Sequence, residues 1–148
     1  MDVYNKEAVQ AVWARVTASK EQSLEEFCIR VEQAGEIYRS LAARFPKHRS
    51  FFLTLARDEM RHAKQLLALY YLQFGCTPNR KAEPANIPRK LCEVIRECYQ
   101  RETGAVQRYT AASEQFPDQR SLFLTLSADS ARHAERLMAL LQTVPFNM

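Results

Sequence analysis

A repeated segment constrains this chain more than any other feature of its sequence. At an offset of 71 residues the chain aligns FPKHRSFFLTLARDEMRHAKQLLAL, from Phe45, with FPDQRSLFLTLSADSARHAERLMAL, from Phe116, and 15 of 25 positions are identical. Tyr38 and Tyr109 match at the same offset. Each half therefore predicts the same unit, a pair of antiparallel helices that turns at a Phe-Pro corner, and two such pairs predict an all-α four-helix bundle.

The prolines indicate where the helices end, because a proline within a helix removes a hydrogen bond and clashes with the preceding turn. Between the prolines, apolar residues recur at helical spacing. The length of 148 residues suits one domain, so we treat 1–148 as a single domain with a full-sized core. The predicted elements are a short N-terminal helix at about 4–17, a helix pair at about 21–75, a loop at 75–88 and a second helix pair at about 89–142.

The loop GCTPNRKAEPANIP, at 75–88, is the only long connection that the sequence predicts. Fourteen extended residues reach about 45 Å, whereas a helix of 26 residues is about 39 Å long. The loop can therefore run the length of the bundle. This predicts a crossover connection, with the second and third main helices parallel.

Composition excludes several classes of protein. Only three glycines are present, too few for hairpin-rich sheets, a dinucleotide-binding fingerprint or a phosphate-binding loop. The net charge of +4 is spread along the chain, so we expect no nucleic-acid partner. We also expect no membrane association and a cytoplasmic location, because neither a run of about 18 apolar residues nor a signal-peptide core is present. No C-x-x-C pair is present for a zinc ribbon or a rubredoxin-type iron site, since the four cysteines are widely spaced: Cys28, Cys76, Cys92 and Cys98.

Two carboxylates and two histidines interrupt the apolar stripes. Glu59 and His62 are three residues apart, so one helix face presents both side chains to a metal ion. His133 repeats His62, and Glu102 lies two turns before Tyr109 on the same stripe. An unpaired buried carboxylate costs several kcal/mol, so a cation or the two imidazoles must compensate these charges.

These residues resemble the rubrerythrin-like branch of the ferritin-like superfamily, over almost the whole chain from about Leu24 to Leu141. That family has two E-x6-Y helices and two E-x-x-H helices around a di-iron centre. The glutamates expected at Val31 and Ser130 are absent, so four of six ligands remain. The matching segments are Val31 to Tyr38, Glu59 to His62, Glu102 to Tyr109, and Ser130 to His133.

The resemblance implies that the two metal positions are unequal. Glu59, Glu102 and His133 would remain for one ion, whereas the other ion would keep only Glu59 and His62. The neighbouring Glu32 would add a ligand there only if the first main helix were rotated or locally distorted.

The main hypothesis is therefore a degenerate metal-carboxylate protein that holds one ion per chain or none, iron or else zinc or manganese. Its redox activity, of the oxidoreductase or peroxidase type, is weakened or lost, and electrons for any residual activity come from another protein. The alternative is a metal-free bundle, in which the glutamates and histidines satisfy one another and the helices serve for dimerisation or partner binding.

The resemblance and the apolar side chains of Trp13, Tyr70, Tyr71 and Phe74 also predict a homodimer.

Overall fold

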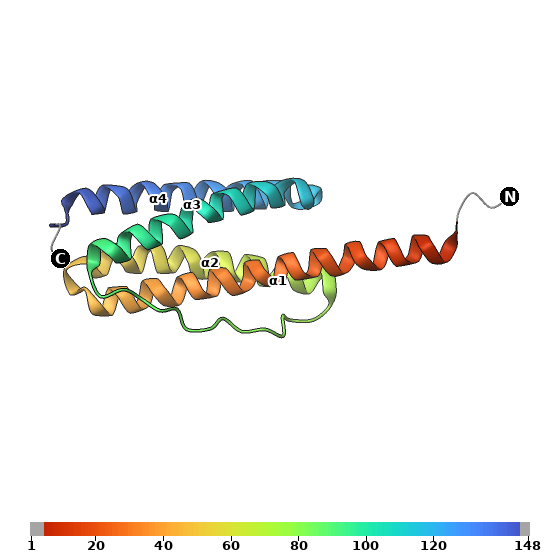
Figure 1. The fold of residues 1–148 in the computed structure, drawn as a ribbon, viewed down its shortest axis with the longest axis horizontal. Helices are drawn as coiled ribbons and strands as arrows, with labels where there is room; N and C mark the ends of the chain where they lie inside the picture. The colour runs from red at the N-terminus through yellow and green to blue at the C-terminus, as the bar shows by residue number, and fades with distance from the viewer. Residues whose placement is uncertain (1–4, 146–148) are drawn as a thin grey trace. The chain divides into compact units, whose positions relative to one another are not determined.

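The computed structural model describes residues 5–145, which form two helix pairs (Figure 1). The first compact unit, Met1–Pro84, holds α1 and α2, and the second, Ala85–Met148, holds α3 and α4. No strand occurs in the described range, which confirms the all-α class. The elements are α1 (Lys6–Arg44), η1 (Pro46–His48), α2 (Arg49–Phe74), α3 (Leu91–Gln115), η2 (Pro117–Gln119) and α4 (Arg120–Thr143).

The two Phe-Pro corners confirm the repeat at the level of the backbone. Phe45 ends α1 at φ −119° and ψ 79°, and Phe116 ends α3 at φ −119° and ψ 74°. In both units the proline then starts a single turn of 3-10 helix, where its fixed φ and missing N–H are tolerated. Equivalent sequence therefore builds equivalent turns, as the 71-residue offset predicts.

Aromatic packing behind each corner also repeats. Tyr38 and Phe52 lie with ring centroids 6.5 Å apart in the first unit, and Tyr109 and Phe123 lie 6.4 Å apart in the second. All four side chains are buried. Each helix pair thus has its own apolar core, built from the stripes that the sequence predicts.

A separate N-terminal helix does not form, and that part of the prediction is wrong. Residues from Lys6 onward belong to α1, which continues without a break for 39 residues; Tyr4, where the predicted helix began, lies outside the described residues. Neither proline nor glycine occurs between Lys6 and Gly35, so nothing in the sequence stops the helix. Asn5 starts it, because its side-chain oxygen accepts hydrogen bonds from the N–H groups of the second and third helical residues.

The connection after α2 follows α1, as a crossover requires. Gly75 ends α2 at φ 71°, a left-handed conformation that suits glycine, and its N–H donates to the Tyr71 carbonyl at 2.8 Å. Farther along the loop, Arg80 pairs with Glu26 at 2.6 Å. The Gln33 side-chain amide then donates to a loop carbonyl, that of residue 83, at 3.0 Å. The loop therefore runs back along α1 in the first unit (Figure 1).

The repeat exchanges a small and a large residue between paired helices. A Cβ added to Gly35 would lie 3.9 Å from Met60 Cγ, across the first unit. The equivalent positions in the second unit are Val106 and Ala131. There the large residue is on the first helix of the pair, the small one is on the second, and both line a groove of about 610 Å³. The large residue therefore lies on the second helix of the pair in the first unit and on the first helix of the pair in the second unit.

Within residues 5–145, no helix combines the length and the apolar character that crossing a membrane needs.

Candidate metal centre

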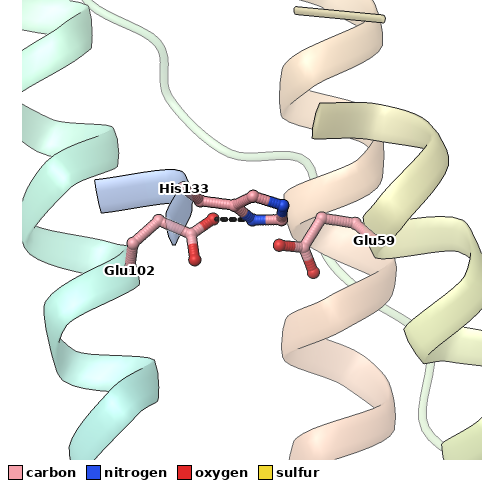
Figure 2. A group of neighbouring side chains, drawn as sticks. All are labelled: Glu59, Glu102 and His133. Carbon is pink, nitrogen blue, oxygen red and sulfur yellow. Dashed lines mark hydrogen bonds and ion pairs between the residues drawn. The ribbon is translucent and has the colours of Figure 1, made fainter. Parts of the chain in front are cut away.

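The second unit pairs a buried carboxylate with a buried imidazole. Glu102 projects from α3 and His133 from α4, and Figure 2 shows the two side chains directed toward each other. Nδ1 of His133 lies 3.3 Å from Oε1 of Glu102. The side chains are 1% and 4% exposed, so water does not screen their interaction.

The first unit has a corresponding pair on a single helix. His62 follows Glu59 by three residues on α2, and its Nδ1 lies 3.5 Å from Oε2 of the glutamate. Both residues are buried. The helical spacing therefore places all four predicted ligands inside the protein, and each histidine faces a carboxylate of its own unit. Their role as metal ligands stays a prediction.

The positions that lack the expected glutamates are also buried. Val31 is 2% exposed on α1, and Ser130 is 1% exposed on α4. The side chains there now pack in the interior and carry no charge. Glu32, the neighbouring acid that would have replaced one missing ligand, is exposed on α1. It therefore does not supply a buried carboxylate, and the first unit keeps only Glu59 and His62.

A further buried acid lies near the second pair. Asp129 is 5% exposed and makes an ion pair with Arg132, one turn along α4. Its repeat mate, Asp58, is half-buried and pairs with Arg61 at 3.3 Å. The repeated Asp-x-x-Arg spacing was the available sequence signal for these pairs. Each arginine neutralises its aspartate, so we do not count either acid as a metal ligand.

Two cysteines on the core stripes have unreactive thiols. Burial raises the pKa of the Cys28 thiol to about 11 and that of the Cys98 thiol to about 12. Both are free and remain protonated near neutral pH. They behave as small core residues, and a thiol is a poor metal ligand until it loses its proton.

Comparison with known proteins identifies the fold. No protein-family model matches the sequence, and no curated protein matches it. A solved structure of a ferritin-like, diiron-carboxylate protein from Bacillus anthracis strain Ames is similar to this chain with a TM-score of 0.74. The match covers 85% of this chain and 97% of that one, at 22% sequence identity. This chain has the ferritin-like fold. The expectation drawn from the sequence, an all-α ferritin-like protein, is confirmed at the level of the fold.

The N···O distances within the two Glu–His pairs fit a metal ion bound by both side chains at least as well as they fit a hydrogen bond. An N···O distance of 3.3 or 3.5 Å is long for a hydrogen bond, whose usual length is about 2.9–3.0 Å. Two ligand atoms about 2.1 Å from one ion in tetrahedral or octahedral geometry lie about 3.0–3.4 Å apart. Carboxylate oxygen and imidazole nitrogen are also the donors that iron, zinc and manganese accept. The residues present therefore fit a divalent metal ion.

Proposed function

We propose that this ferritin-like protein is a metal-carboxylate protein of the rubrerythrin-like kind, which holds one divalent ion per chain. The Glu102–His133 pair carries the proposal, because it is buried, comes from two helices and is spaced for a common ion. Glu59 is the third ligand.

The three ligands balance the charge of the ion. Two ionised carboxylates neutralise a divalent cation, and the cation in turn compensates the cost of burying them. His133 adds a neutral nitrogen ligand next to the carboxylate of Glu102. A second ion would keep Glu59 and His62 only, because Val31 and Ser130 offer no carboxylate. We therefore propose a site for one ion, with waters in the remaining positions.

Bound iron would supply one-electron redox chemistry at this site. A reaction that needs two irons is lost when only one is bound, so we propose that any oxidoreductase activity is weak. Glu102, Glu59 and His133 would hold the ion. Tyr109, two turns after Glu102 on α3, is buried.

A metal-free role is the second candidate, and the same contacts favour it. Protonated His133 would form an ion pair with Glu102, and protonated His62 would form one with Glu59. The four side chains would then satisfy one another without a cation, and the helices would serve as a scaffold for dimerisation or partner binding.

Metal content separates the two candidates. The protein is purified without chelator, metal per chain is measured by elemental analysis, and the metal-free form is titrated with Fe²⁺ without oxygen, and with Zn²⁺ and Mn²⁺. We expect one ion per chain. Binding should stabilise the fold by about 2.7 kcal/mol at a free concentration 100 times the dissociation constant. It should weaken below about pH 6, because protons then compete for the imidazole and the carboxylates.

Variants test the ligand assignment. Glu102→Gln and His133→Ala should each abolish binding, whereas His62→Ala, the matched control, should weaken it less. Restoring glutamate at Val31 and Ser130 together should raise the stoichiometry to two. If the protein binds no metal and the double restoration also binds none, the metal proposal is wrong and the scaffold role stands.

A further inference from the structure

The first part of α1 extends beyond the helix that covers the rest of it. In the first unit, the Tyr70 hydroxyl of α2 donates to Glu21 at 2.8 Å, and α2 ends one turn later, at Phe74. All residues from Lys6 to Ser19 are helical and exposed. Figure 1 shows this segment, coloured red, projecting past the end of α2. Fourteen residues of α-helix span about 21 Å.

This projecting segment carries an apolar stripe. Val9, Val12, Trp13 and Val16 follow the i, i+3, i+4, i+7 spacing of one helix face, and they are 40%, 49%, 66% and 40% exposed. Trp13 lies three helical turns before Leu24, which is fully buried. The stripe therefore continues the same face of α1 that α2 covers farther along.

The exposed apolar face of this segment is a possible packing surface. Most helical stability in proteins comes from packing an apolar face, and residues 6–19 of α1 have such a face exposed. The opposite face of the segment has alanines at positions 11, 14 and 18, so the large apolar side chains lie on one face only.

We propose that residues 6–19 form a self-association site, which packs antiparallel against the same segment of a second copy of this chain. In the first unit α2 runs antiparallel to α1 and ends at Phe74. A second copy's segment in the antiparallel direction takes up the position beyond that end and continues the cover of the stripe. The contact is isologous, so one patch serves both copies.

The charges at the ends of the segment favour this direction. Centring the pair between Val12 and Trp13 places Val9 opposite Val16 of the second copy. Lys6 then lies opposite Ser19 of the second copy, and Lys20 lies opposite its Asn5. A parallel pair would place each lysine against itself, and like charges in contact disfavour association.

The size of the stripe predicts a weak dimer. Trp13 offers roughly 150 Å² of exposed surface, and both copies of the stripe together offer on the order of 700 Å². Specific stable interfaces usually bury about 1,200–2,000 Å². We therefore expect dissociation at micromolar concentrations rather than a permanent dimer. This proposal is independent of the metal site, because none of its residues lies near Glu59, Glu102 or His133 in the sequence.

Concentration series provide the first test. Trp13 is the only tryptophan, so its fluorescence reports on this segment alone. On concentration from the micromolar to the millimolar range, we expect the emission to shift to shorter wavelength while light scattering gives a mass rising from 17.1 kDa toward twice that value. Trp13→Glu should stay monomeric at every concentration. Ala14→Glu, its matched control on the opposite face, should dimerise as the natural sequence does, with the same helix content by circular dichroism.

Cross-linking tests the direction. Val9→Cys and Val16→Cys are prepared separately in a Cys76→Ser background, which removes the exposed native thiol. A mixture of the two variants should form disulfide dimers, because antiparallel pairing brings residues 9 and 16 within the Cα separation of about 4.4–6.8 Å that a disulfide needs. Val9→Cys alone should not.

Three results would overturn the proposal. The first is a monomer at millimolar concentration with an unshifted tryptophan emission. The second is undiminished dimerisation of Trp13→Glu, which would place the interface elsewhere. The third is failure of the mixed variants to cross-link while dimers still form through Trp13. In that case the stripe binds another surface of the second copy, such as the groove between α3 and α4.

Discussion

The exchange of residue sizes between the two units predicts how Gly35 and Met60 depend on each other. A methyl group at Gly35 would meet Met60 Cγ at 3.9 Å and Glu59 Cβ at 3.8 Å, which are ordinary contacts. Gly35→Ala should therefore stabilise the protein by roughly 0.5–1 kcal/mol, through the better helix propensity of alanine and its lower chain entropy when unfolded. Gly35→Val adds two more methyl groups to the same space. It should lose about 1–3 kcal/mol through overpacking against Met60.

The double variant of Gly35→Val with Met60→Ala copies the equivalent pair of the second unit. It should therefore not show the loss of stability expected for Gly35→Val alone. Met60→Ala takes away a side chain that is 41% exposed, so its cost should fall at or below the lower end of the 2–5 kcal/mol typical of buried methionine. In the double variant, the valine can take up the space that Met60 vacated, and Val106 and Ala131 are the equivalent residues of the second unit. The free energy of unfolding of the double variant should then exceed, by at least about 1 kcal/mol, the value expected from adding the two single changes.

Denaturation of metal-free protein in urea, followed by circular dichroism, measures all four corners of this cycle. Helix content is a suitable signal because Trp13 is exposed and senses little of the packing at Gly35. Additivity of the two single changes to within about 0.5 kcal/mol would refute the reasoning. So would destabilisation by Gly35→Ala, since it would mean that α1 and α2 tolerate no added carbon at this level.

Thiol reactivity and one buried hydrogen bond provide further predictions. In the native protein at pH 8, iodoacetamide should modify the exposed thiol of Cys76 quickly, and it should modify Cys28 and Cys98 only on unfolding. The reason is that both of these thiols are buried, which raises their pKa values to about 11 and 12. Modification of all three cysteines at the same rate would contradict this prediction. The free energy of unfolding should fall as the pH rises from about 9 toward 12, because the unfolded chain ionises these thiols first, and serine at both positions should reduce that slope. Tyr70→Phe should cost about 1 kcal/mol in urea denaturation by removing the hydrogen bond to Glu21, and no loss would show that the bond contributes nothing net.

The sequence predicted the parts of this fold that depend on local chemistry. The Phe-Pro corners follow from the restrictions on proline, and they occur where the prolines predict them. Burial of Glu59 and His133 follows from helical spacing, because a stripe that is apolar on both sides of a polar residue carries that residue inward.

Other parts depended on information that the sequence does not display. The separate N-terminal helix was wrong because a helix continues unless something stops it, and the predicted break had no glycine or proline to stop it. The size exchange at Gly35 becomes visible only when the facing residue on α2 is known. Sequence does not separate a metal-binding role of Glu102 and His133 from an ion pair, since both require the same residues at nearly the same separation.

The three-residue turns at Pro46 and Pro117 have a consequence for the biosynthesis of the chain. Each turn joins two helices that are neighbours in sequence, so the contacts within a unit are local, and local contacts favour fast folding. The first unit ends at Pro84, well before α4 begins at Arg120. Chains leave the ribosome at about 5–20 residues per second, slowly compared with the pairing of two helices. The first helix pair therefore has time to form while most of the second is still being translated.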